Sequence, residues 1–342
     1  MSSFKEALLK PLICAKPILV DRPTASDSSE MTASSPSRLA SFHGDVAFCQ
    51  SRRLLATANS DKKEIRVYRY LSGNWVLAKK GRFDAYSRGL CWSGDGSRLA
   101  WIEQTKSGDR EAVWDFNRLI RFSDSHGGFT PSVVEGICLS NSGKSIAIAR
   151  NNGADVYTIG LGRTRSYELD QSPLVSVAFS PHDDLVAAGR SVIAVSARGS
   201  RATTSLRHDY IGSLACNKRQ SSFLALTFEP KLTLNLLPGS APYKTVWHGS
   251  GYPAGVAWSP NGKYAAVCLV SKKGTGSSQS NRIVVFATKE WRIIRTIRLG
   301  ANDAGDLQFD FSSSILSASV HQETILWSVP SGERAPLALT NK

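Results

Sequence analysis

The chain has 342 residues, of which 42% are hydrophobic, 9% aromatic and 20% charged. This apolar content is enough for a large core and too high for a disordered chain. No stretch approaches the roughly 18 uninterrupted apolar residues of a membrane-spanning helix, so that class is excluded. The formal net charge is +14, an excess of cations that a folded core by itself does not require.

The N-terminal segment differs in composition from the rest of the chain. Its apolar stretch over residues 7–20 is interrupted by Lys10 and Lys16 and by two prolines, and no small-residue cleavage site follows it. These features argue against a cleaved secretory signal. Residues 24–37 are rich in Ser, Thr and Pro, which is typical of a linker. We therefore predict a flexible extension over residues 1–36 and one folded unit over 37–342.

The folded unit contains seven short apolar strands, each followed by a polar turn. They begin the segments 46–50, 90–94, 137–141, 177–181, 214–218, 256–260 and 307–311. Their mean spacing is about 43 residues, the length of one four-stranded propeller blade. After each turn a second apolar strand follows, as in 54–58 and 145–149, and then a third, as in 65–70 and 282–286. The gaps between strands are too short for crossover helices. The sequence therefore predicts an all-β fold, a seven-bladed β-propeller of four-stranded antiparallel blades.

A closed ring needs a last strand to cover its open edge. Two segments could supply it, residues 37–42 near the N-terminus and residues 335–339 near the C-terminus. Pro336 is unfavourable within a hydrogen-bonded ladder. We expect the N-terminal strand to close the ring and the C-terminal segment to form an extra edge strand or a tail.

The turns after the first strands carry a recurring polar signature. It occurs as Ser93-Gly94-Asp95-Gly96, and again in the segments 140–143, 180–183 and 259–262. Trp114-Asp115 closes one third strand, and Trp327 occupies the same place in the last repeat. Together with the repeat length, this pattern resembles the WD (Trp-Asp) repeat family over the whole chain after about residue 37.

The resemblance implies a structural hydrogen-bond network that stabilises the turns. In such repeats a histidine shortly before the first strand bonds to an aspartate of the same blade. The residues of this chain that match the network positions are His43, Asp61, His126, His208, His248, Trp114 and Trp327.

The six cysteines show no C-x-x-C pair, and five of them lie in or beside apolar strands. Isolated thiols in such positions act as small hydrophobic groups. They are typical of a reducing compartment, so we expect the protein in the cytoplasm or the nucleus.

No catalytic constellation is visible. The chain lacks a G-x-S-x-G elbow and an H-x-x-x-H pair, and its Gly-rich segment at 272–278 lacks the order of a phosphate loop. We therefore expect no cofactor, no metal and no enzymatic activity. Lys272 and Lys273 lie in a long loop, residues 271–281, which is either an insertion without a role or a binding loop.

Many cations fall in or near predicted fourth strands, the outermost strands of the blades. Those singled out as contacts for a polyanion are Arg163, Arg165, Arg201, Arg207, Arg292, Arg295 and Arg298. Lys79, Lys80, Arg82, Arg118 and Arg121 extend the same basic belt. Such a belt either keeps the protein soluble and protects strand edges or binds nucleic acid or an anionic lipid surface.

The sequence thus favours a monomeric ring that acts as a non-enzymatic interaction scaffold. Partner proteins, or the other subunits of a complex, would dock on one face of the propeller. The alternative is a propeller that binds RNA, DNA or anionic phospholipid through its basic outer rim.

Overall fold

The computed structural model describes the larger part of the repeat region. The described residues are 42–43, 45–59, 62–72, 74–83, 86–106, 108–122, 134–150, 153–160, 162–168, 176–188, 192–195, 201–204, 211–217, 222–227, 232–237, 244–270, 281–300, 304–320, 323–329 and 339–340. The predicted extension over residues 1–36 lies outside them. Among the described residues, no helix has the length and apolar character that crossing a membrane requires.

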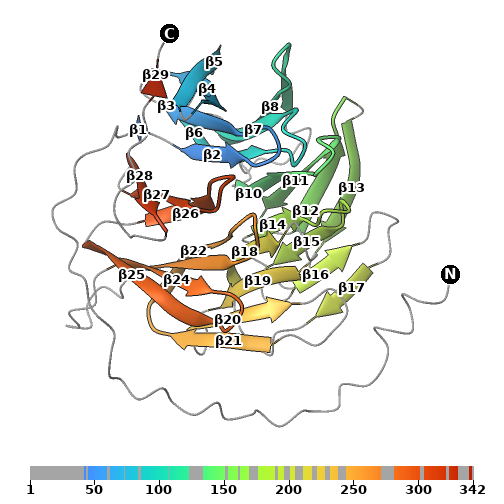
Figure 1. Cartoon of the computed structure of the whole chain (residues 1–342). Helices are drawn as coiled ribbons and strands as arrows, with labels where there is room; N and C mark the ends of the chain where they lie inside the picture. The colour runs from blue at the N-terminus through green and yellow to red at the C-terminus, as the bar shows by residue number, and fades with distance from the viewer. Residues whose placement is uncertain are drawn as a thin grey trace.

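The described strands form seven sheets arranged in a ring, which we number as blades 1 to 7 in chain order (Figure 1). The first strands of the blades are β2 (Val46–Cys49), β6 (Tyr86–Trp92), β10 (Val134–Leu139), β14 (Ser176–Phe179), β18 (Ile211–Asn217), β22 (Tyr252–Trp258) and β26 (Ala304–Phe309). The second strands are β3 (Leu54–Asn59), β7 (Leu99–Thr105), β11 (Ser145–Arg150), β15 (Leu185–Ala188), β19 (Ser222–Thr227), β23 (Tyr264–Val270) and β27 (Ile315–Val320).

The third and fourth strands complete each sheet. The third strands are β4 (Glu64–Leu71), β8 (Gly108–Trp114), β12 (Gly153–Thr158), β16 (Val192–Val195), β20 (Leu232–Leu237), β24 (Asn281–Ala287) and β28 (Glu323–Ser328). The fourth strands of blades 1 to 6 are β5 (Asn74–Arg82), β9 (Leu119–Phe122), β13 (Gly162–Glu168), β17 (Arg201–Thr204), β21 (Lys244–Gly249) and β25 (Arg292–Gly300). The predicted architecture, an all-β propeller of four-stranded antiparallel sheets, is confirmed.

The ring is closed by the N-terminal strand, as predicted. Strand β1 (Phe42–His43) pairs antiparallel with β28, with Phe42 opposite Thr324, and so becomes the fourth strand of blade 7. Strand β29 (Leu339–Thr340) pairs parallel with β5, with Leu339 opposite Trp75. The C-terminal segment is therefore an extra edge strand on blade 1, which thereby has five strands.

The hydrophobic core is divided into clusters that each lie between two neighbouring blades. One cluster joins Trp101 of blade 2 to Ala56 and Val67 of blade 1, and another joins Ile148 of blade 3 to Ile102 of blade 2. Because both faces of a blade are covered, its middle strands are buried along their whole length, as in β19. Burial of each large side chain contributes about 1.5–3 kcal/mol. This explains why the sequence shows apolar runs rather than strict alternation.

Four aromatic rings form the cluster where the last blade meets the first. The ring of Trp75 lies 6.0 Å from that of Phe48 and 5.2 Å from that of Tyr70. Tyr70 in turn lies 5.2 Å from Phe311 of blade 7. Across the same boundary the amide of Phe48 donates to Gln308 Oε1 at 3.1 Å. Aromatic packing therefore reinforces the site at which the two ends of the repeat array meet.

Candidate functional site

The strand directions give the ring two different faces. The turns between first and second strands, together with those between third and fourth strands, lie at one face, which we call the turn face. The connections that precede the first strands and those that join second to third strands lie at the other, which we call the loop face. These two faces differ in their chemistry.

The turn face repeats one local hydrogen-bond pattern, at positions that the sequence signature marks. The hydroxyl of Ser93 accepts from the amide of Arg98 at 3.0 Å. The corresponding bonds are Ser145 N to Ser140 Oγ, Asp184 N to Ser180 Oγ, Tyr264 N to Ser259 Oγ and Ile315 N to Asp310 Oδ1. Each bond contributes on the order of 1 kcal/mol and fixes the turn locally. These serines are buried, so their role is structural.

Turns of neighbouring blades are also bonded to one another on this face. Arg52 of blade 1 donates from Nε to the carbonyl of Asp95 at 2.8 Å. The amide of Asp95 donates to the carbonyl of Asn141 in blade 3 at 2.8 Å. The amide of Asn141 then donates to Asp183 Oδ1 of blade 4. The turns of four consecutive blades are therefore connected, which makes this face rigid.

The carboxylate of Asp95 is held in its charged form by its own turn. Burial acts to raise its pKa, but bonds from the Ser93 hydroxyl and from the amide and hydroxyl of Ser97, with the nearby Arg52 cation, lower the pKa below its ordinary value. The donors lie 2.6, 2.9 and 2.8 Å from Oδ1. Protonation would weaken all of these bonds.

The Trp114-Asp115 pair also lies at the turn face, where Asp115 caps the turn between β8 and β9. Its carboxylate accepts from the amides of Asn117 and Arg118 at 3.0 and 2.8 Å, and from Arg118 Nε at 3.2 Å. Burial acts to raise the pKa of Asp115, and these bonds outweigh it and lower the pKa. Trp114 packs 5.0 Å from the ring of Phe116.

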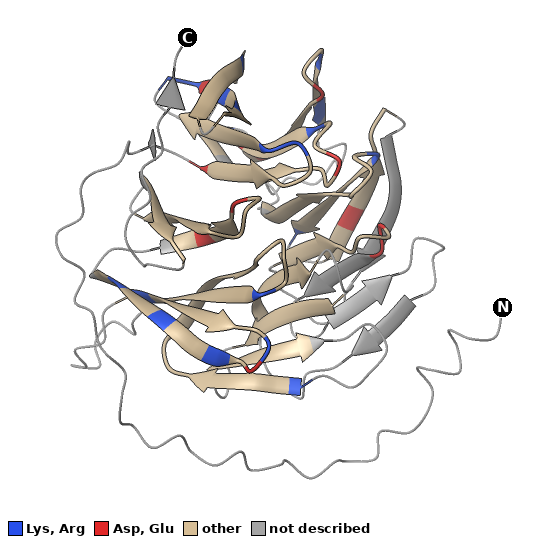
Figure 2. Ribbon diagram, in the orientation of Figure 1, with Lys and Arg blue, Asp and Glu red and all other residues tan. Residues whose placement is uncertain are grey.

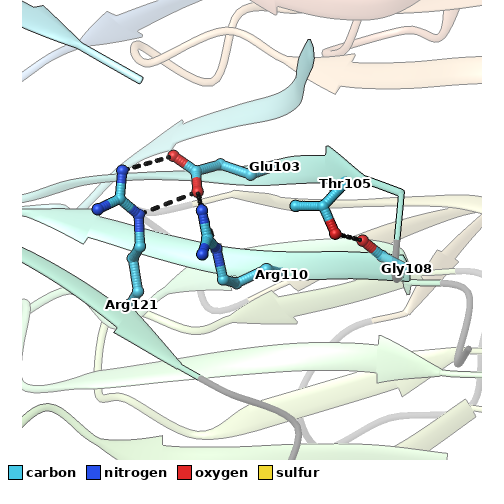
Figure 3. A network of polar contacts seen from close by, with 5 residues as sticks. All are labelled: Glu103, Thr105, Gly108, Arg110 and Arg121. Atoms are coloured by element: carbon cyan, nitrogen blue, oxygen red, sulfur yellow. Dashed lines mark hydrogen bonds and ion pairs between the residues drawn. The ribbon is translucent and has the colours of Figure 1, made fainter. Parts of the chain in front are cut away.

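The loop face holds buried carboxylates that the sequence analysis did not single out. Glu103, near the end of β7, is completely buried. Arg110 Nε donates to its Oε2 at 3.0 Å, and Arg121 Nε donates to the same oxygen at 3.1 Å (Figure 3). Beside them, the Thr105 hydroxyl donates to the carbonyl of Gly108 at 2.7 Å and closes the turn between β7 and β8. One buried anion therefore joins the second, third and fourth strands of blade 2.

A second group of buried charges joins blade 2 to blade 3. Arg150 NH2 lies 2.7 Å from Glu111 Oε1, and Arg150 Nε lies 3.4 Å from Asp155 Oδ2. All three side chains are at least nine-tenths buried. Burial raises the pKa of the neighbouring Tyr157, and the carboxylate of Asp155 raises it further. The only sequence signal for either group is a charged residue inside an apolar strand.

The positions predicted for the His–Asp network fall largely outside what the structure describes. Asp61, His126 and His208 are not among the described residues. His43 lies in β1, where its backbone pairs with Glu323. His248 lies in β21 with an exposed side chain, and Trp327 is buried between blades 6 and 7. In the turns that are described, serine and aspartate side chains provide the repeated hydrogen bonds.

The predicted basic belt divides into parts with different surroundings. Arg163 and Arg165 lie in β13 and Arg201 lies in β17, but their side chains are outside the described part, as are Arg207, Lys272 and Lys273 altogether. In blade 2, Arg121 and Arg118 face carboxylates. In blade 6, Arg292 and Arg298 are exposed and Arg295 is half-buried along β25. Figure 2 shows this recurrence of basic residues on β25.

The described residues contain no group of three or more His, Cys, Asp or Glu side chains placed to hold a metal ion. The five described cysteines are free thiols. Burial raises the pKa of the Cys268 thiol to about 12. Such a thiol stays protonated at neutral pH and is a poor nucleophile.

Comparison with known proteins supports the fold. No family model matches the chain, and no curated protein matches it by sequence. Among solved structures, it is similar to the β-propeller domain of Cps50 (Swd1) from Myceliophteria thermophila, with a TM-score of 0.64 and 16% identity. The match covers 83% of this chain and 96% of that domain. At this identity the likeness concerns the β-propeller fold alone.

Proposed function

We propose that this protein is a non-enzymatic interaction scaffold, a WD-like propeller whose loop face docks partner proteins. The observation that carries the proposal is the contrast between the two faces. The turn face uses its polar groups to bond one blade to the next, whereas the loop face bears connections of very different lengths. Rigid strands that present variable loops are the usual basis of recognition surfaces.

The connections at the loop face illustrate this variation. Strand β9 ends at Phe122 and β10 begins at Val134, and β23 ends at Val270 and β24 begins at Asn281. By contrast, β21 ends at Gly249 and β22 begins at Tyr252. Tyr252 itself is 44% exposed at this face. An exposed tyrosine is a common anchor in protein interfaces, because its ring is apolar and its hydroxyl is polar.

The test compares matched substitutions on the two faces. Tyr252→Ser with Lys106→Glu changes the loop face, and Lys263→Ser with Lys144→Glu changes exposed positions of the turn face. Partners captured by the intact protein should be lost from the first variant and kept by the second, with affinities then measured on the purified partner. Equal losses from both variants, with folding intact by circular dichroism, would overturn the loop face as the docking site.

The second candidate function is binding of a polyanion by the outer rim. The exposed arginines of β25 favour it, whereas Arg118 and Arg121 in blade 2 already face carboxylates. Phosphate contacts make binding steeply salt-dependent. Retention on heparin that does not change between low and moderate salt would exclude this candidate.

A further inference from the structure

The outer strands β5 of blade 1 and β25 of blade 6 form a natural pair for comparison. Both have nine residues, and no other fourth strand in the described part is as long. Strand β5 is covered at its outer edge by β29, which adds to the sheet in parallel. Strand β25 is the last strand of its sheet among the described residues. The ring therefore has two long edges, one with an added strand and one without.

A long edge strand is a template for pairing with another extended segment. Soluble proteins usually protect such an edge with charges, a proline or a covering element. On β25 the protection consists of arginines, but these alternate with an exposed apolar residue, Ile293, which is 46% exposed. The edge thus offers backbone groups, one apolar contact and a series of cations.

The cations on β25 are not balanced by the ion pairs that characterise blades 2 and 3. Arg292 lies 4.0 Å from Glu290, with the two side chains 72% and 61% exposed, so this pair contributes little. Across the ladder Arg298 lies directly opposite Arg282, a like-charge pair that destabilises a sheet. Arg282 is turned to the loop face, where it donates to the carbonyl and hydroxyl of Ser250.

We propose that the outer edge of β25 is a second docking site, which binds an extended acidic segment of a partner protein as a fifth strand of blade 6. Backbone bonds to the edge would supply affinity, and carboxylates on the added strand would meet Arg292, Arg295 and Arg298. The edge of blade 1 shows the same arrangement within one chain, since β29 lies against β5. This inference rests on the proposed scaffold function and adds the chemistry of one partner to it.

The site favours a peptide over a nucleic acid because of how the arginines are placed. A bulge separates Val285 from Phe286 in the ladder between β24 and β25, and Arg292 and Arg295 pair with residues on the blade 7 side, whereas Arg298 pairs on the blade 5 side. A paired strand can present side chains alternately to both sides. A phosphate backbone would need the cations on one continuous surface.

The probe is a fluorescent peptide as long as β25, with alternating Val and Glu, added to the full-length protein in a polarisation titration. The triple variant Arg292→Glu, Arg295→Glu and Arg298→Glu should weaken binding at least tenfold. The control, Lys79→Glu, Lys80→Glu and Arg82→Glu on β5, makes the same change of charge on the covered edge and should alter binding less than twofold.

A second probe separates strand addition from simple charge attraction. The same peptide with alternate amides N-methylated keeps its charge but cannot complete the backbone ladder, so it should bind at least tenfold more weakly. Equal binding of the two peptides would overturn the proposal. So would displacement of the peptide by single-stranded DNA that is lost in the triple variant, because the site would then be a polyanion site. If the peptide fails to bind while the Tyr252 and Lys106 substitutions still abolish partner capture, the scaffold function stands without this site.

Discussion

The turn face and the loop face of the ring are stabilised by different kinds of contact. On the turn face, short-range bonds such as that from the Arg98 amide to Ser93 recur from blade to blade. On the loop face, buried ion pairs such as Arg150 with Glu111 occur in particular blades and join residues far apart in sequence. The comparison indicates that the first face determines the common geometry of the blades, whereas the second differs between them.

This difference has a functional consequence. A face whose polar groups are used in bonds between blades has few left for a partner, and its contacts leave little room for change. A face that varies in loop length and in buried charge can be altered in one blade without disturbing the others, because repeat units contact mainly their neighbours. We therefore expect stability to be most sensitive to the buried charges and partner choice to the loops above them.

The largest effect is expected from Arg150→Met, which removes the cation between Glu111 and Asp155. Both carboxylates would remain buried, and breaking a buried pair in this way costs about 3–5 kcal/mol. The free energy of unfolding, measured by urea denaturation at neutral pH, should fall by that amount.

Arg118→Met is the matched control on the turn face. Arg118 is paired with Asp115, but its side chain is 63% exposed, so its loss should cost less than about 1 kcal/mol. Equal losses in the two variants would remove the distinction between the faces.

The sequence predicted the parts of the molecule that depend on local signals. Repeat spacing located the strands, the Ser-Gly-Asp-Gly turn at 93–96 marked a bonded corner, and Pro336 favoured closure by the N-terminal strand. These follow from residues close together in the chain. The partner of Glu111 could not be predicted, because Arg150 lies 39 positions away in another blade. The arginines of β25 were recognised as exposed cations, but only the sheet order shows that they lie along a long open edge.

A smaller effect is expected from Gly94→Ala, which tests whether the turn face is rigid. An added Cβ would lie 1.7 Å from Asn141 Oδ1 and 2.9 Å from Asn141 Cα, in the turn of the next blade. Because that backbone must shift, the substitution should cost about 1–3 kcal/mol by thermal or urea unfolding. Gly255→Ala is the control, since its Cβ would meet nothing closer than 3.7 Å. A neutral Gly94→Ala would show that neighbouring turns can separate freely.

The smallest effect is expected from Asp95→Asn, and its pH dependence is the informative part. The folded protein lowers the pKa of Asp95 below its ordinary value of 3.8, so the carboxylate stabilises the fold above that pH. This stabilisation is lost as the pH falls through the lowered pKa. At neutral pH the variant should be less stable by about 0.5–1 kcal/mol, since it retains an oxygen acceptor. Urea titrations between about pH 7 and pH 3 should then show the two proteins converging, whereas parallel curves would mean that the carboxylate charge contributes nothing to the turn.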